Sequence, residues 1–135
     1  MNKRIGFVIL TVLLLLLAGC GQNVGQAKTQ FCSDWNELGA AIQNAKSLNE
    51  NSTVEETKAA KDEIAKAWDK ARNSGGQLQE VQLEATEQAL NAMTQVIDDI
   101  PEEATLGQAN IAVQAAVNAF DTAYTAINTT VCTAR

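Results

Sequence analysis

Apolar residues recur at helical spacing in four successive blocks of this chain. No block alternates with the two-residue period that a strand requires. The clearest block fits a seven-residue repeat whose only polar member is Asn110, and it contains Leu106, Val113, Val117, Phe120, Tyr124, Ile127 and Val131. Alanines between these positions favour the helical conformation intrinsically. The pattern predicts a helix over residues 106–131.

The first block predicts a helix from about Phe31 to Leu48. Its stripe advances in steps of three and four residues and comprises Phe31, Trp35, Leu38, Ile42 and Ala45, with Leu48 closing the series. Gly39 lies inside this helix, where glycine costs about 1 kcal/mol relative to alanine. Either the helix makes a close contact with an alanine-rich neighbour at Gly39, or it tolerates this cost.

The second and third blocks have sequence signals at their ends. Thr53 and Glu56 have the spacing of a capping box, which predicts the start of the second helix. Ser74-Gly75-Gly76 should end it, because glycine can adopt the left-handed conformation of a C-terminal cap. The third helix should begin near Leu78 and end before Pro101, since proline disfavours helical angles in the preceding residue.

Four amphipathic helices joined by short connections most often pack as an antiparallel bundle. The expected fold class is therefore all-α, with residues 31–135 forming an up-down-up-down four-helix bundle. One charged residue, Lys61, falls within the apolar stripe of the second helix and weakens it.

The first twenty residues have the parts of a secretory leader: Lys3 and Arg4, an apolar run over 5–17, and small residues before Cys20. Leu17-Ala18-Gly19-Cys20 resembles the lipobox of bacterial lipoproteins. The resemblance implies that residues 1–19 are a signal peptide, that diacylglycerol is attached to the sulfur of Cys20, and that the new amino terminus is acylated. Two or three acyl chains would anchor the protein stably to a membrane. The alternative is an ordinary signal peptide with a chance cysteine.

Residues 20–30 are mostly Gly, Gln, Asn and Thr, which predicts a flexible tether between the lipid and the bundle. Removing Lys3 and Arg4 would change the formal charge from −6 to −8. Residues 73–134 carry eight acidic and no basic side chains. Such a chain is a poor binder of nucleic-acid phosphates. Its acidic half would attract a basic protein partner in the envelope, or it is simply a solvated acidic face.

Cys32 lies at the start of the first predicted helix and Cys132 at the end of the last. In an up-and-down bundle with an even number of helices, both positions fall at the same end. Export would place them in an oxidising compartment, where such a pair usually forms a disulfide. An intrachain bond is compatible with a monomer. The alternatives are two free thiols or a bond to another chain.

Few groups in the sequence are suited to catalysis or cofactor binding. There is no histidine, and histidine is both the commonest general base and the commonest transition-metal ligand. No glycine-rich phosphate loop, nucleophile elbow or Cys-x-x-Cys motif appears. The acidic segment 98–103 lacks the spacing and central glycine of a calcium-binding EF-hand loop. We therefore expect no catalytic residue, no cofactor and no metal, and we interpret Trp35 and Trp68 as core residues.

These observations favour a non-enzymatic protein of the bacterial envelope. It would be held by lipid at the outer membrane or at the outer face of the cytoplasmic membrane, with its bundle in a protein-interaction or structural role. A second hypothesis is a binding protein for a small apolar ligand held between the helices, which would need a cavity of about 300 Å³ or more.

Overall fold

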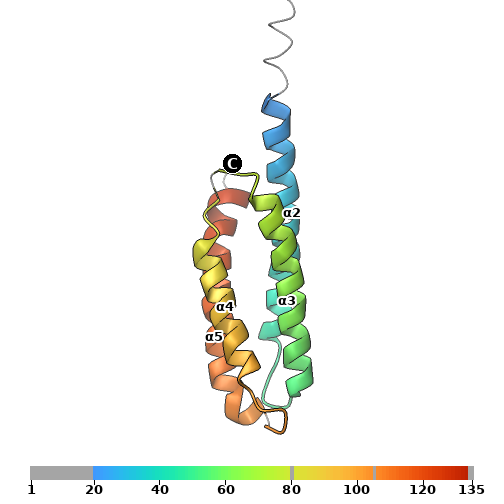
Figure 1. The fold of residues 1–135 in the computed structure, drawn as a ribbon, viewed down its shortest axis with the longest axis vertical. Coiled ribbons are helices and arrows are strands. Elements are labelled where there is room, and N and C mark those ends of the chain that lie inside the picture. Colours follow the sequence, from blue (N-terminus) through green and yellow to red (C-terminus); the bar gives the residue numbers. More distant parts are fainter. Residues whose placement is uncertain (1–19, 80, 105, 134–135) are drawn as a thin grey trace, which may run out of the picture.

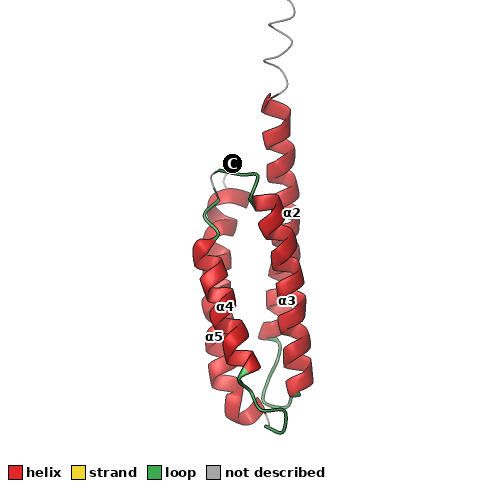
Figure 2. Cartoon of the chain, viewed as in Figure 1, coloured by secondary structure: helices red, strands yellow, loops and turns green. Residues whose placement is uncertain are grey.

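The computed structural model describes residues 20–79, 81–104 and 106–133, which form four α-helices and one π-helical segment and contain no strand. These elements are α2 (Cys20–Lys46), α3 (Val54–Gly75), α4 (Glu84–Asp98), α5 (Leu106–Ile127) and η1 (Asn128–Cys132), which continues α5. Figures 1 and 2 show the helices side by side along one long axis. The expected all-α four-helix bundle is confirmed.

The order of neighbours around the bundle follows the order of the chain. Contacts join α2 to α3, α3 to α4, α4 to α5, and α5 back to α2. In Figure 1 the α3–α4 connection and the C-terminal end of the chain lie at one end of the bundle. This arrangement is compatible with the up-down-up-down topology.

The predicted apolar stripes supply the core. Trp35, Phe31 and Phe120 are completely buried, and residues from all four helices surround them. The other large side chains that are apolar and fully buried are Leu38, Ile42, Ile64, Met93, Val113 and Val117. Packing of these stripes, more than helix propensity, stabilises helices of this length.

The N-terminus of α3 carries the predicted capping box. The Thr53 hydroxyl accepts a hydrogen bond from the Glu56 N–H at 3.1 Å, and the Glu56 carboxylate accepts one from the Thr53 N–H at 2.8 Å. Both donors would otherwise lack a partner within the helix. The capping-box prediction is confirmed.

The C-terminus of α3 ends at the predicted glycines, but the expected reason was wrong. Gly76 has φ −61°, which is right-handed, and no glycine among the described residues has a positive φ. Gly75 is buried instead against Phe31, where an added Cβ would lie 2.9 Å from a ring carbon. Gly75 is thus required for close packing between α2 and α3.

The helix α4 begins at Glu84, and the prediction of a start near Leu78 was wrong. Leu78, Val81 and Leu83 lie in the connection before α4 and pack against the core without being helical. Their apolar character reflects burial under a connection at the end of the bundle. Periodicity cannot distinguish this kind of burial from a helix turn.

Residues 20–30 also differ from the expectation, because they form the first turns of α2 and not an irregular tether. The N-terminal part of α2 projects beyond the end of the bundle in Figure 1. Residues 23–26 are exposed, and a solvated helix accepts polar residues as readily as a loop does. These turns continue the rigid, buried part of α2, which removes the need for a separate helix nucleus.

Candidate functional site

The two predicted disulfide partners meet at the end of the bundle from which α2 projects. The Cys32 and Cys132 sulfur atoms lie 2.06 Å apart, and their Cα atoms 5.5 Å apart. Cys132 is the last residue of η1, so the pair joins the first and last helical segments across 100 residues. Both side chains are partly buried against the core.

A cluster of aromatic rings lies next to this cysteine pair. Trp35 stacks on Tyr124 with ring centroids 5.3 Å apart, and it also contacts Phe31 and Trp68. The indole N–H of Trp35 donates to the backbone carbonyl of Tyr124 at 3.3 Å. Trp35 and Trp68 are 0% and 3% exposed, so they belong to the core as predicted and do not line a ligand groove.

Gly39 makes room for this stack. A Cβ at Gly39 would lie 2.7 Å from Cζ of Tyr124 and closer still to its hydroxyl oxygen. The close-contact explanation is therefore correct: the alanine-rich neighbour is α5, and the atoms nearest Gly39 belong to the Tyr124 side chain. Burial, and then the negative charge of Asp121, raise the pKa of the Tyr124 hydroxyl above its usual value.

A groove of about 550 Å³ opens at the same end of the bundle. Its walls are the exposed start of α2, represented by Val24 and Lys28, and the connection between α3 and α4, represented by Leu78 and Val81. Val131 of η1 also lines it. Val24 is 62% exposed, which is unusual for a large apolar residue of this protein. The groove lies at the end of the bundle, whereas the hypothesis of an apolar ligand placed its cavity between the helices.

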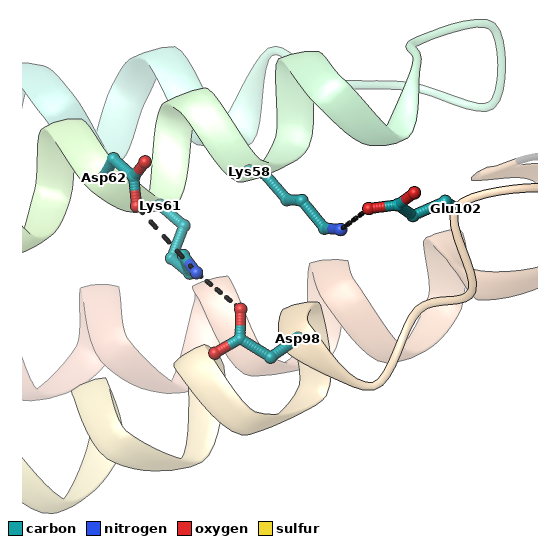
Figure 3. Close-up of polar contacts among 5 residues, drawn as sticks. All are labelled: Lys58, Lys61, Asp62, Asp98 and Glu102. Carbon is teal, nitrogen blue, oxygen red and sulfur yellow. Dashed lines mark hydrogen bonds and ion pairs between the residues drawn. The ribbon is translucent and has the colours of Figure 1, made fainter.

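The opposite end of the bundle is acidic. Residues 47–56 and 98–104 include seven acidic and no basic residues. Figure 3 shows how α3 meets this end: the Lys61 ammonium lies 2.5 Å from an Asp98 oxygen, and the Lys58 ammonium 3.5 Å from Glu102. Lys61, the charged residue in the apolar stripe of α3, therefore lies where α3 meets α4. Its side chain is 16% exposed. Ion pairs at a surface contribute about 0–1 kcal/mol each.

Two further pairs join α2 to its neighbours. The Lys46 ammonium lies 2.7 Å from Asp121 of α5, and the Lys70 ammonium of α3 lies 2.8 Å from Glu37. The hydrogen bond that Lys70 donates to the Glu37 carboxylate, together with the negative charge of Glu37, raises the pKa of Lys70. Glu37 and Asp121 are thus paired with lysines, as Asp98 and Glu102 are, whereas Asp99 and Glu103 are exposed to solvent.

The remaining predicted site residue, Cys20, is the first residue of α2. The rest of the lipobox, Leu17-Ala18-Gly19, lies outside the described residues. Among the described residues, no helix is both long and apolar enough to cross a membrane. Nor do they include a group of three or more His, Cys, Asp or Glu side chains that could hold a metal ion.

Sequence reasoning missed the groove and the tyrosine stack, because each is made by segments far apart in the chain. The only available signals were the isolated apolar residue Val24 in a polar segment and the glycine inside the first helix. No protein-family model, curated protein sequence or solved structure matches this chain.

Proposed function

We propose that this chain is a lipid-anchored protein of the bacterial envelope whose bundle has a protein-interaction or structural role and performs no catalysis. The observation that carries the proposal is the sequence Leu17-Ala18-Gly19-Cys20 directly behind an apolar run. The place of Cys20 in the part of α2 that projects beyond the bundle supports it, because a lipid on Cys20 would lie clear of the other helices. The lipid would then attach to a rigid helix.

The charge distribution supports a basic protein as the partner. The acidic end of the bundle, formed by residues 47–56 and 98–104, lies away from the projecting start of α2. An anchor at Cys20 would leave this acidic surface accessible from outside the membrane. A surface of one charge sign accelerates association with a partner of the opposite sign, and salt weakens the effect.

The anchor is tested by Cys20→Ser. Intact-mass measurement of the membrane fraction should show diacylglycerol and acyl groups on the wild-type chain starting at Cys20. The Cys20→Ser protein should remain as an unlipidated precursor. A wild-type mature chain without lipid, cut at another position, would show that the lipobox resemblance is misleading.

The partner role is tested by crosslinking in the envelope, with two double variants that change the charge equally. Asp99→Asn with Glu103→Gln removes two acids from the acidic end, and both residues are exposed. Glu63→Gln with Asp69→Asn removes two exposed acids along α3 and serves as the control. Only the first pair should reduce the yield of the crosslinked partner, and added salt should reduce the wild-type yield. Equal yields from both double variants would exclude the acidic end as the contact surface.

A further inference from the structure

The groove beside the start of α2 combines apolar side chains with a lysine. Val24, Leu78 and Val81 give it an apolar lining, and Lys28 places one ammonium group at its edge. Among the described residues, Lys28 has no acidic side chain within ion-pair distance, unlike Lys46, Lys58, Lys61 and Lys70. An apolar groove with an unpaired cation suits an amphiphile with a negatively charged head.

The two ends of the bundle also differ in charge. At the groove end, Lys28 is the one charged residue among the described residues 20–30, 76–79, 81–83 and 128–133, so this end carries a charge of +1. At the opposite end, residues 47–56 and 98–104 contain seven acids, and Lys58 and Lys61 of α3 pair with two of them, which leaves a charge of −5. An anionic surface would attract the groove end and repel the opposite end.

The position of Cys20 fixes the distance between the groove and an anchoring membrane. Lys28 is eight residues after Cys20 in the same helix, a rise of about 12 Å, and Val24 is only about 6 Å along the axis. The interfacial layer of a bilayer, which contains the headgroups, is about 5–8 Å thick on each side. A lipid on Cys20 would therefore bring Val24 to the headgroup layer and the groove to its outer edge.

We propose that the groove end of the bundle docks onto an anionic phospholipid bilayer, with lipid headgroups filling the space between the start of α2 and the lining residues Gln77, Leu78, Gln79 and Val81. Lys28 donates to a lipid phosphate, Val24 lies within the headgroup layer, and Leu78 and Val81 contact headgroups at its outer edge. The bundle then stands end-on, with its acidic end away from the membrane. This inference rests on the proposed anchor at Cys20 and adds a second contact that sets the orientation.

The test uses the full protein isolated from membranes and reconstituted into phosphatidylcholine vesicles that contain phosphatidylglycerol. A nitroxide is attached at Gln79→Cys in the groove wall or at Asn51→Cys at the opposite end, both of which are exposed positions. The introduced cysteine is selectively labelled because Cys32 and Cys132 are paired and Cys20 carries the lipid. Power saturation should show that the label at position 79 loses access to a water-soluble nickel chelate when the protein is on the vesicles. The label at position 51 should remain accessible to the chelate.

A pair of charge-reversal variants then tests the role of Lys28. Lys28→Glu should restore access of the chelate to the label at position 79, whereas Lys66→Glu, an equal change at an exposed position of α3, should not. Raised salt should act in the same direction as Lys28→Glu.

The outcomes separate the docking from the anchor. Protein that floats with the vesicles but exposes both labels equally would overturn the docking and leave the anchor intact. An equal effect of Lys28→Glu and Lys66→Glu would overturn the proposed headgroup contact. Protein that carries no lipid by intact mass and does not float would overturn the anchor and the docking with it.

Discussion

Thr86 allows a test of how much a buried hydroxyl without a hydrogen-bond partner destabilises the bundle. This residue of α4 is completely buried, and its hydroxyl has no hydrogen-bond partner in the structure. Thr57 of α3 is equally buried, but its hydroxyl donates to the Thr53 carbonyl at 3.0 Å. Both residues lie near the start of their helices, so the same substitution at the two sites isolates the effect of the hydrogen bond.

Thr86→Val should stabilise the protein. A buried hydroxyl without a partner costs about 1–3 kcal/mol, and the methyl group that replaces it adds about 0.8 kcal/mol of burial. Small packing adjustments reduce this sum, so the free energy of unfolding should rise by about 1–3 kcal/mol. A gain of 1 kcal/mol corresponds to about 4 °C in Tm for a domain of this size.

Thr57→Val should be close to neutral. The substitution loses a hydrogen bond worth about 0.5–1.5 kcal/mol and gains about 0.8 kcal/mol from the methyl group. The Thr53 carbonyl keeps the backbone N–H of Thr57 as a donor, at 3.1 Å, so no acceptor is left unpaired.

Chemical denaturation of the two variants, followed by far-ultraviolet circular dichroism, gives the comparison directly. We expect Thr86→Val to exceed Thr57→Val in stability by at least about 1 kcal/mol. If Thr86→Val is destabilised, or equals Thr57→Val, then the Thr86 hydroxyl has a partner in solution and the reasoning from its burial is refuted.

Three further predictions concern the cysteine pair and the tyrosine stack. Cys132→Ser should lower the free energy of unfolding by about 2–5 kcal/mol with the helical signal retained. Adding Cys32→Ser should lower the free energy of unfolding no further, because both substitutions remove the same bond. Additive losses of stability in denaturation curves would contradict a shared bond. Gly39→Ala should destabilise the protein by about 1–3 kcal/mol through overpacking against Tyr124. Combining it with Tyr124→Phe should recover part of that loss, because the hydroxyl oxygen nearest the added methyl group is removed. Strictly additive shifts in Tm for the two substitutions would argue against the contact. Because burial raises the Tyr124 pKa in the folded state above 10.0, the folded protein keeps a proton that the unfolded chain releases. Its stabilising contribution should be complete below about pH 10 and decline above it. Denaturation at stepped alkaline pH should show a shallower decline for Tyr124→Phe, and identical slopes would refute the assignment.

Local patterns in the sequence were sufficient for the helices and their stripes. The spacing of apolar residues along α5 and the Thr53–Glu56 pair each involve residues within a turn or two of one another, where helical geometry alone relates them. The meeting of Cys32 and Cys132 could also be predicted, because an even number of antiparallel helices brings the first and last ends together. The seven-residue apolar repeat over residues 106–131 could be identified without knowledge of the neighbouring helices.

Only the tertiary structure decided the features that depend on contacts between distant segments. A glycine in the sequence does not show which side chain packs against it. Gly39 lies against the ring of Tyr124, and Gly75 against the ring of Phe31, each from another helix. Leu78 and Val81 cover the bundle end from a non-helical connection, which their apolar character could not distinguish from a helix. The groove exists because α2 continues to Cys20 past this connection. Apolar periodicity reports which residues are buried, whereas the shape and identity of the surface that buries them are set by packing between helices.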